Sequence, residues 1–295
     1  MKTKLFLFIP LVAGVVYLAG CQKEGCTDPN AINYDANAKK DDGSCITDTT
    51  DNDVLGCMDS TSTNYNPDAT VDDGTCMYDT ISTVMLHAHA KLGTADFAFN
   101  SEVTNWEGRK MKFTTAQMYV SNFVFHKDGG MQMVDDSYLL LKAGTMMYEV
   151  GEIPNDHYHG FGFKVGVDSI ANHADPASWP SEHALSSNNP DHAFWSWNSG
   201  FIFIKVEGMV DTTANMDGTA NAPFIYHIGT DMLAKDVMFT KHEEVNADIT
   251  YHINVDYLKL FDGIDLRTDP DSHTMNNMPA AMTFSGNVPD AISVQ

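Results

Sequence analysis

Two histidines close together in the chain have the spacing of metal ligands. His87 and His89 are two residues apart, and alternate side chains of a β-strand lie on the same face. The apolar residues of the other parity are Val84, Leu86, Ala88 and Ala90. Both imidazoles are therefore predicted to project from the face that does not enter the core, where they could share a soft or borderline metal ion. Two solvent-facing histidines on a strand are the alternative interpretation.

Other histidines and methionines are weaker candidates in a chain that contains 12 His and 17 Met. His157 and His159 repeat the two-residue spacing, but their polar and glycine neighbours predict a loop. His252, on the polar face of its strand, is predicted to be solvated rather than ligating. A loose thioether cluster could bind Cu(I) or simply fill gaps in the packing. Its members are His273, Met275, Met278 and Met282.

The composition excludes several classes of protein. The sequence has 40 acidic and 17 basic residues, a net charge of -23, and no basic run that could hold a phosphate backbone, so nucleic acid is excluded as a partner. The usual motifs of hydrolases, kinases and dehydrogenases are absent, and no enzyme activity is predicted. The acidic field would concentrate cations near the protein.

The segments that carry these residues are predicted to form β-strands. Residues 249–257 alternate cleanly between apolar and polar side chains, and Asp128-Gly129-Gly130 predicts a hairpin turn. No amphipathic helix is predicted beyond the first 20 residues. We expect an all-β fold, an antiparallel β-sandwich over residues 81–295, with long loops around 168–198 and 262–280. The predicted strands are 81–91, 112–126, 131–141, 160–167, 200–207, 222–228 and 249–257.

The N-terminus has the features of an exported lipoprotein. Residues 1–20 combine Lys2 and Lys4 with an apolar run and read as a signal peptide, and Cys21 is predicted to be the lipidated first residue of the mature chain. A transmembrane anchor is the alternative, although the apolar run is shorter than the ~20 residues that span a bilayer. Residues 21–24 resemble a surface-export signal. The expected location is the outer membrane, facing the cell exterior, with a periplasm-facing protein as the alternative.

An internal repeat over residues 25–80 contains the other four cysteines. Residues 25–45 and 56–76 are identical at ten of 21 aligned positions, and each begins and ends with the same cysteine spacing. The simplest pairing is Cys26 with Cys45 and Cys57 with Cys76, although four cysteines allow three connectivities. The pattern predicts two small, loop-rich modules that are closed by disulfides and form an acidic stalk.

The repeats also share three aspartates each, followed by a glycine. Carboxylate oxygens beside a glycine-permitted turn could bind Ca²⁺, but the spacing of a complete EF-hand loop is missing. Asp-rich turns capped by their own side chains are the alternative. Zinc is disfavoured because the cysteines are too widely spaced and no histidine lies in the repeats. The residues in question are Asp28, Asp41, Asp42, Asp59, Asp72 and Asp73.

Five sequence blocks, taken in order, resemble the MbnP-like, methanobactin-associated copper-binding family. They are YVSNFVF at 119–125, GVDSIANHADP at 166–176, FWSWNSGFIFIKVEG at 194–208, YHIGT at 226–230 and VDYLKLFDG at 255–263. The resemblance covers roughly residues 81–290. It implies a secreted or surface β-sandwich that holds Cu(I) through two imidazoles and a tryptophan oxidised to kynurenine, with a di-haem peroxidase as partner.

Carrying this resemblance onto single residues gives a set of candidates. The metal ligands would come from His87, His89, His173 and His227. The modified tryptophan would be Trp195 or Trp197, which lie in the matching block, or Trp106, which lies outside it. A buried aromatic platform is the alternative role for the pair at 195 and 197. Unlike some relatives, this chain has no cysteine after Cys76 and no histidine-containing tail, which puts any ligand from the tail in doubt.

Two classes of function follow from these observations. The first is a surface lipoprotein that binds copper for acquisition or homeostasis, with the peroxidase and an outer-membrane transporter as partners. The second is an adhesion or structural lipoprotein whose repeats are stabilised by calcium and whose sandwich has no copper site, since a fold alone does not fix a function.

Overall fold

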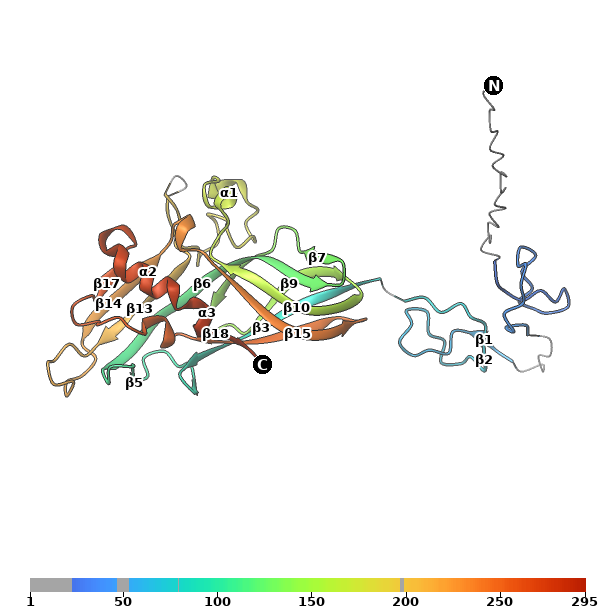
Figure 1. Cartoon of the computed structure of the whole chain (residues 1–295), viewed down its shortest axis with the longest axis horizontal. Coiled ribbons are helices and arrows are strands. Elements are labelled where there is room, and N and C mark those ends of the chain that lie inside the picture. The colour runs from blue at the N-terminus through green and yellow to red at the C-terminus, as the bar shows by residue number, and fades with distance from the viewer. Residues whose placement is uncertain (1–22, 47–52, 79, 197–198) are drawn as a thin grey trace, which may run out of the picture. The chain divides into compact units, whose positions relative to one another are not determined.

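The computed structural model describes residues 23–46, 53–78, 80–196 and 199–295 (Figure 1). The chain divides into two compact units, Met1–Tyr78 and Asp79–Gln295. The predicted signal peptide 1–20, the lipidation residue Cys21 and Gln22 lie outside the described residues. None of the helices in the described segments is both long enough and apolar enough to span a bilayer.

The first unit consists mainly of turns held by two disulfides. Cys26 pairs with Cys45 and Cys57 with Cys76, which is the connectivity that the repeat favours. Its regular structure in the described residues is one short parallel pair, β1 (Leu55–Gly56) and β2 (Val71–Asp72). A unit with so little regular structure depends on the cross-links, because each closes a loop of a chain that lacks a large core.

The repeat aspartates cap turns in the first unit. Asp28 Oδ1 accepts a hydrogen bond from the backbone N–H two residues later, and the same contact is made by each of the other five, at 2.9–3.1 Å. This is the geometry of the Asp-rich turn that the sequence left as an alternative to calcium. In the described part of the repeats, these carboxylates do not gather into a group of three ligands.

The second unit is a β-sandwich, as the sequence predicts. In the larger sheet the order is β15 (Lys235–Val245), β10 (Asp156–Val165), β6 (Lys110–Lys127), β13 (Ile204–Val210), β14 (Ala222–Ile228) and β17 (Asp271–Ser272). The short strands β5 (Val103–Thr104), β7 (Gly130–Met133) and β8 (Tyr138–Lys142) also pair with β6. In the smaller sheet the order is β18 (Ile292–Val294), β16 (Ile249–Asp256), β3 (Ile81–Leu92) and β4 (Ala95–Asp96), and β9 (Met147–Pro154) pairs with β3. A separate hairpin joins β11 (Phe194–Ser196) to β12 (Gly200–Phe201).

Aromatic side chains from both sheets meet in the core. The ring of Tyr251, on β16 of the smaller sheet, lies 4.3 Å from that of Phe161 on β10 and 5.6 Å from that of Phe125 on β6, between ring centroids. All three side chains are at most 2% exposed. Each such pair adds about 0.5–1.5 kcal/mol to the free energy of unfolding beyond the burial of apolar area. The core thus fixes the two sheets against each other, and their outer faces carry the polar residues.

Several details differ from the sequence-based expectation. In the described part of the second unit, two pairs of neighbouring strands are parallel, β3 with β16 and β14 with β17, within a mainly antiparallel fold. The long strands β9 and β15 were not predicted. His157 and His159 lie in β10 rather than in a loop. The region 131–141 forms two separate strands, β7 and β8, because the chain turns at 134–137.

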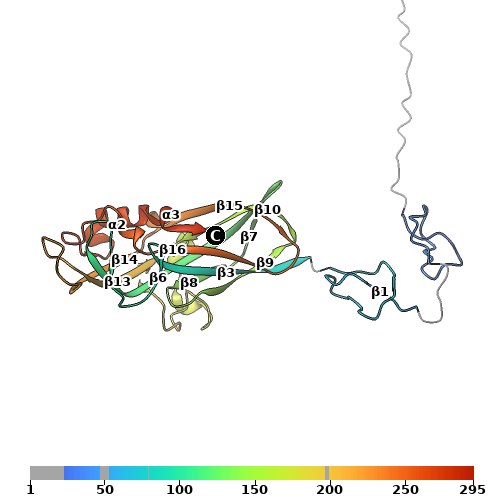
Figure 2. The same cartoon turned by 90° about the horizontal axis from the view of Figure 1, so that it is seen from below.

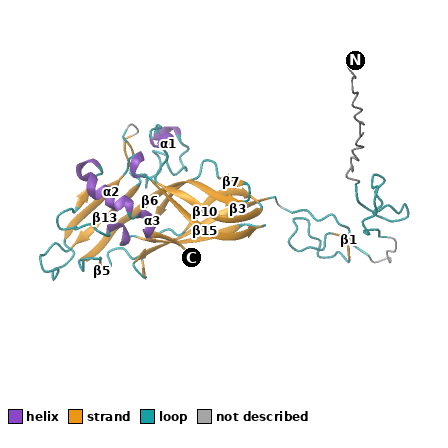
Figure 3. Ribbon diagram, viewed as in Figure 1, coloured by secondary structure: helices purple, strands orange, loops and turns teal. Residues whose placement is uncertain are grey.

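Helices are also present where none was predicted. Helix α1 (Ser169–Asn172) is a single turn, whereas α2 (Met278–Gly286) and α3 (Val288–Ala291) follow one another and pack against β14 and β15 (Figures 2 and 3). The Oδ1 of Asn277 accepts the N–H of Ala280 and caps α2. The short 3₁₀ helices are η1 (Pro176–Ser178), η2 (Asp231–Leu233), η3 (Lys259–Phe261) and η4 (Met275–Asn277).

Candidate metal centre

The parallel pair β3 and β16 presents three histidines on one face. His252 lies opposite His87 in the strand register, and Asn254 lies opposite His89. In both strands the residues of the other parity are buried in the core, so the histidines lie on the outer face and are half-buried. The alternation of apolar and polar residues in the sequence therefore sets the face on which each imidazole lies. The parallel pairing of β3 with β16 then brings His252 beside His87.

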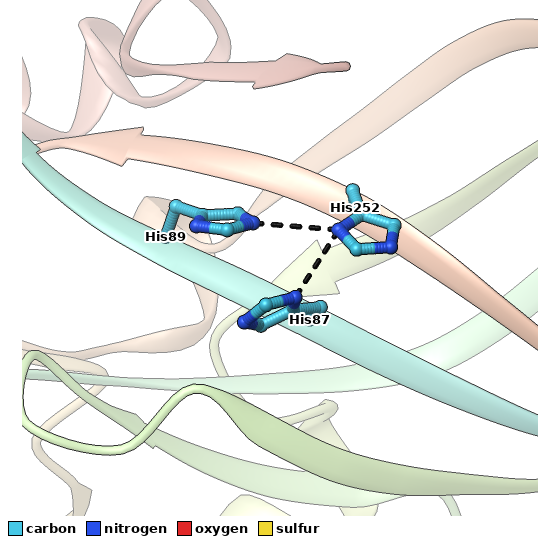
Figure 4. A group of neighbouring side chains, drawn as sticks. All are labelled: His87, His89 and His252. Carbon is cyan, nitrogen blue, oxygen red and sulfur yellow. Dashed lines mark hydrogen bonds between the residues drawn. The ribbon is translucent and has the colours of Figure 1, made fainter.

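The three imidazoles are close enough to share one ion (Figure 4). His87 Nδ1 lies 3.1 Å from His252 Nδ1, and His89 Nε2 lies 3.4 Å from the same atom. One ligand nitrogen from each residue falls within 4.8 Å of the other two. The ring centroids of His87 and His89 are 4.0 Å apart. Three nitrogen atoms at this separation are close enough to ligate one ion.

The surroundings of His89 favour the neutral form of its imidazole. Burial lowers the pKa of His89, and the neighbouring His87, His252 and Lys91 act in the same direction, whereas Asp96 opposes them. A neutral imidazole has a free lone pair, and imidazole nitrogens suit copper among other transition metals. The donor set is therefore compatible with copper, the metal that the sequence resemblance implies.

The prediction that His252 is solvated is wrong. Its ring is half-buried and contacts both His87 and His89. The alternation of residues 249–257 correctly placed it on the polar face of its strand. What the sequence did not reveal is that β16 pairs with β3, a contact between residues 165 positions apart.

The other two predicted ligands lie elsewhere. His173 follows α1, is exposed, and has its Nε2 3.3 Å from Asp231 Oδ2. His227, on β14 of the larger sheet, has its Nε2 2.7 Å from Glu207 Oε1. Burial lowers the pKa of His227, although Glu207 opposes this. The structure thus places His87 beside His89, but neither His173 nor His227 belongs to their group.

Of the three tryptophan candidates, Trp195 and Trp106 lie within the described residues. Trp195, on β11, is 37% exposed and does not form a buried platform. It lines a hollow of about 400 Å³ together with His273 and Met275. The ring centroid of His273 lies 4.8 Å from that of His227. Trp106 is 55% exposed, in the turn after β5, and Trp197 lies outside the described residues.

The thioether cluster predicted around residue 273 is only partly assembled. His273 and Met275 line the hollow beside Trp195. Met278 instead packs against the hydrophobic core, and Met282 is exposed on α2. The methionines at 278 and 282 therefore belong to a helix that the sequence analysis did not predict.

Comparison with known proteins assigns the second unit to a family. The MbnP family model matches residues 81–278, about two thirds of the chain. The chain belongs to the MbnP family. A solved structure of MbnP from Methylosinus trichosporium superimposes with a TM-score of 0.52 at 15% sequence identity, covering 73% of this chain and 99% of that one. At this identity the likeness shows a shared fold. No curated protein matches the sequence.

Proposed function

We propose that this protein binds copper, as Cu(I), through His87, His89 and His252. The observation that carries the proposal is the convergence of three imidazole nitrogens within 4.8 Å in a domain of the methanobactin-associated MbnP family. The site is half-buried, and the surroundings of His89 disfavour its charged form. Imidazole nitrogens are established ligands of copper, and a half-buried site limits the access of water to the bound ion.

A second position for copper is the hollow beside Trp195. There an indole lies beside His273 and Met275, and His273 faces His227. This grouping has two imidazoles and an aromatic residue, which is the ligand set that the family resemblance implies after oxidation of the tryptophan to kynurenine. Kynurenine would supply an aryl amine and a ketone oxygen, whereas the carbon atoms of an indole are poor ligands.

The biological setting of the proposal is a lipid-anchored, non-enzymatic protein at the outer surface of the cell. Support for it comes from the apolar segment 1–20, Cys21 and the acidic repeats. In this role the protein would capture copper for acquisition or homeostasis. A di-haem peroxidase would act on the tryptophan, and an outer-membrane transporter would receive the metal.

The two copper positions can be separated by substitution. We expect the full chain to bind one tight Cu(I) in a competition titration with a Cu(I) chelator. His87→Gln combined with His252→Gln should lower the affinity by at least about a hundredfold, since two of three ligands are lost; a hundredfold change corresponds to about 2.8 kcal/mol. His173→Gln, a matched change of an exposed histidine, should have no effect.

Retained affinity in the double variant, together with loss in His273→Gln, would move the copper to the hollow beside Trp195. Peptide mapping of protein from its native host provides the second readout. A Trp195 peptide with the mass of kynurenine would support that position, and unmodified tryptophan with copper bound would support the three-histidine site.

A further inference from the structure

A second group of three imidazoles lies on the other sheet. His157 and His159 on β10 and His242 on β15 each place one ligand nitrogen within 4.8 Å of the other two. The ring centroid of His159 lies 5.0 Å from that of His157 and 5.1 Å from that of His242. Neither strand takes part in the first group, so this cluster stands independently of the copper site proposed above.

An irregularity in strand pairing brings these residues together. His157 and His159 are two positions apart on β10 and share its outer face, while His157 lies opposite Glu244 on β15. The register then shifts: Tyr158 lies opposite Glu243, but Gly160 lies opposite Thr240. The extra residue on β15 forms a bulge, and a bulge re-aims the side chains next to it. His242 Nδ1 thereby comes within 3.2 Å of His159 Nδ1.

Two carboxylates contact the imidazoles of this second group. Glu244 Oε2 lies 3.0 Å from His157 Nδ1, and Asp128 Oδ1, from the turn between β6 and β7, lies 2.9 Å from His159 Nε2. A histidine that ligates a metal ion usually donates its other ring N–H to a carboxylate, which fixes the tautomer and makes the free nitrogen a better ligand. These contacts leave His157 Nε2 and His159 Nδ1 available, and the latter faces His242.

The charge of the second group differs from that of the first. In the described residues, the imidazoles of His87, His89 and His252 make no hydrogen bond to a carboxylate, whereas two carboxylates adjoin the second group. Two carboxylates beside three imidazole ligands favour a divalent cation over a monovalent one, because they balance more of its charge. The site is also exposed on a protein of net charge -23, which raises the local concentration of divalent ions.

We propose that His157, His159 and His242 form a second metal site, which binds a divalent cation of the Zn²⁺ type. Zn²⁺ commonly takes three protein ligands and a fourth from water or a carboxylate in a tetrahedral arrangement. Asp128 and Glu244 orient the ligands and balance the charge. The protein would thus hold two different metals on its two sheets, a monovalent one on β3 and β16 and a divalent one on β10 and β15.

The test uses the full chain with the first group removed by His87→Gln, His89→Gln and His252→Gln. In a Zn²⁺ titration against a chromophoric chelator, this protein should bind one Zn²⁺. Adding His242→Gln should lower the affinity by at least about a hundredfold, because a direct ligand is lost. Adding Glu244→Gln should lower it about tenfold to a hundredfold, the usual cost of losing a carboxylate partner of a ligating histidine.

Glu243→Gln is the matched control. It removes the same charge one residue earlier on β15, where the side chain contacts Lys241 rather than a histidine. The proposal is overturned if the background protein binds no Zn²⁺, if His242→Gln leaves the affinity unchanged, or if both glutamate changes weaken binding equally. Far-UV circular dichroism checks that each variant is folded. If a variant on β15 does not fold, Asp128→Asn tests the same site, because it removes the other carboxylate from a turn outside that strand.

Discussion

At the scale of single residues, one buried carboxylate is held by hydrogen bonds from the backbone. Asp211, just after β13, is 0% exposed and accepts the backbone N–H groups of Thr213 and Gly218, both at 2.9 Å. The hydrogen bond from Thr213 is the main reason that the pKa of Asp211 lies below its ordinary value of 3.8, and Arg109 acts in the same direction. Folding therefore favours the charged form of this side chain.

We predict that Asp211→Asn weakens the fold near neutral pH and flattens its acid dependence. A pKa lowered by folding contributes stability that is present above the unfolded value and is lost as the pH falls through the folded value. The wild type should therefore lose more stability than the variant between about pH 5 and pH 2. Denaturant midpoints across this range measure the difference.

Asp217→Asn is the control for this prediction. Asp217 lies exposed in the same loop. Within the described residues, its side chain accepts one hydrogen bond, from the hydroxyl of Thr213 at 3.3 Å. Its replacement should leave the acid dependence as in the wild type. Parallel acid profiles for wild type and Asp211→Asn would show that the buried carboxylate does not set the slope.

At the scale of elements, glycines let β15 approach β10. A Cβ added at Gly160 would lie 2.2 Å from the carbonyl oxygen of Phe239, and one at Gly162 would lie 2.6 Å from that of Val237. Backbone atoms cannot move aside as a flexible side chain can, so these positions require glycine. The same close pairing holds His242 beside His159.

We predict that Gly160→Ala lowers the free energy of unfolding by about 2 kcal/mol or more, because an overpacked site strains the backbone. It should also weaken Zn²⁺ binding at His157, His159 and His242, and it should spare Cu(I) binding on β3 and β16. Thermal unfolding and the two metal titrations measure these effects.

Gly286→Ala serves as the comparison. No atom would lie within 4 Å of a Cβ at Gly286, the last residue of α2, so stability should be unchanged or slightly higher. If Gly160→Ala behaved like Gly286→Ala, close approach would not be what fixes this strand pair.

The elements also show what the sequence could and could not predict. Strands β3 and β16 were predicted because apolar and polar side chains alternate along most of each segment, and in the structure the apolar set is mainly the buried one. Strand β15 was missed because Lys241 and Glu243 stand at positions where the alternation calls for apolar residues, at the edge of the sheet. Strand β9 was missed because a shift in its pairing with β3 interrupts the two-residue alternation. Helix α2 buries small and aromatic residues without a clear apolar stripe, although Asn277 and Pro279 would have marked its start.

The candidate sites were predicted only as far as local spacing reaches. Two-residue spacing placed His87 beside His89, and the same spacing occurs at His157 and His159. The third member of each group, His252 or His242, comes from a distant strand. Strand pairing between segments far apart in the chain is decided by the packing of the core, which a single sequence does not display.

At the scale of the whole molecule, cross-links and metal groups belong to different units. Both disulfides lie in Met1–Tyr78, and both histidine groups lie in Asp79–Gln295. The second unit contains no cysteine and has its own large hydrophobic core. The stability of the metal sites should therefore be independent of the redox state of the cysteines.

We predict that replacing Cys57 and Cys76 by serine destabilises the first unit alone. Each disulfide closes a loop across a separation of 19 residues, and losing such a cross-link costs about 3 kcal/mol, which a unit with few buried apolar residues cannot offset. Hydrogen exchange of the full chain should show faster exchange in peptides from 53–78 and unchanged exchange across 80–295. Cu(I) and Zn²⁺ affinities should stay at their wild-type values, because the imidazoles are positioned by the sandwich. Loss of either metal in this variant would mean that the repeats support the sandwich, and copper binding would then depend on an oxidising environment.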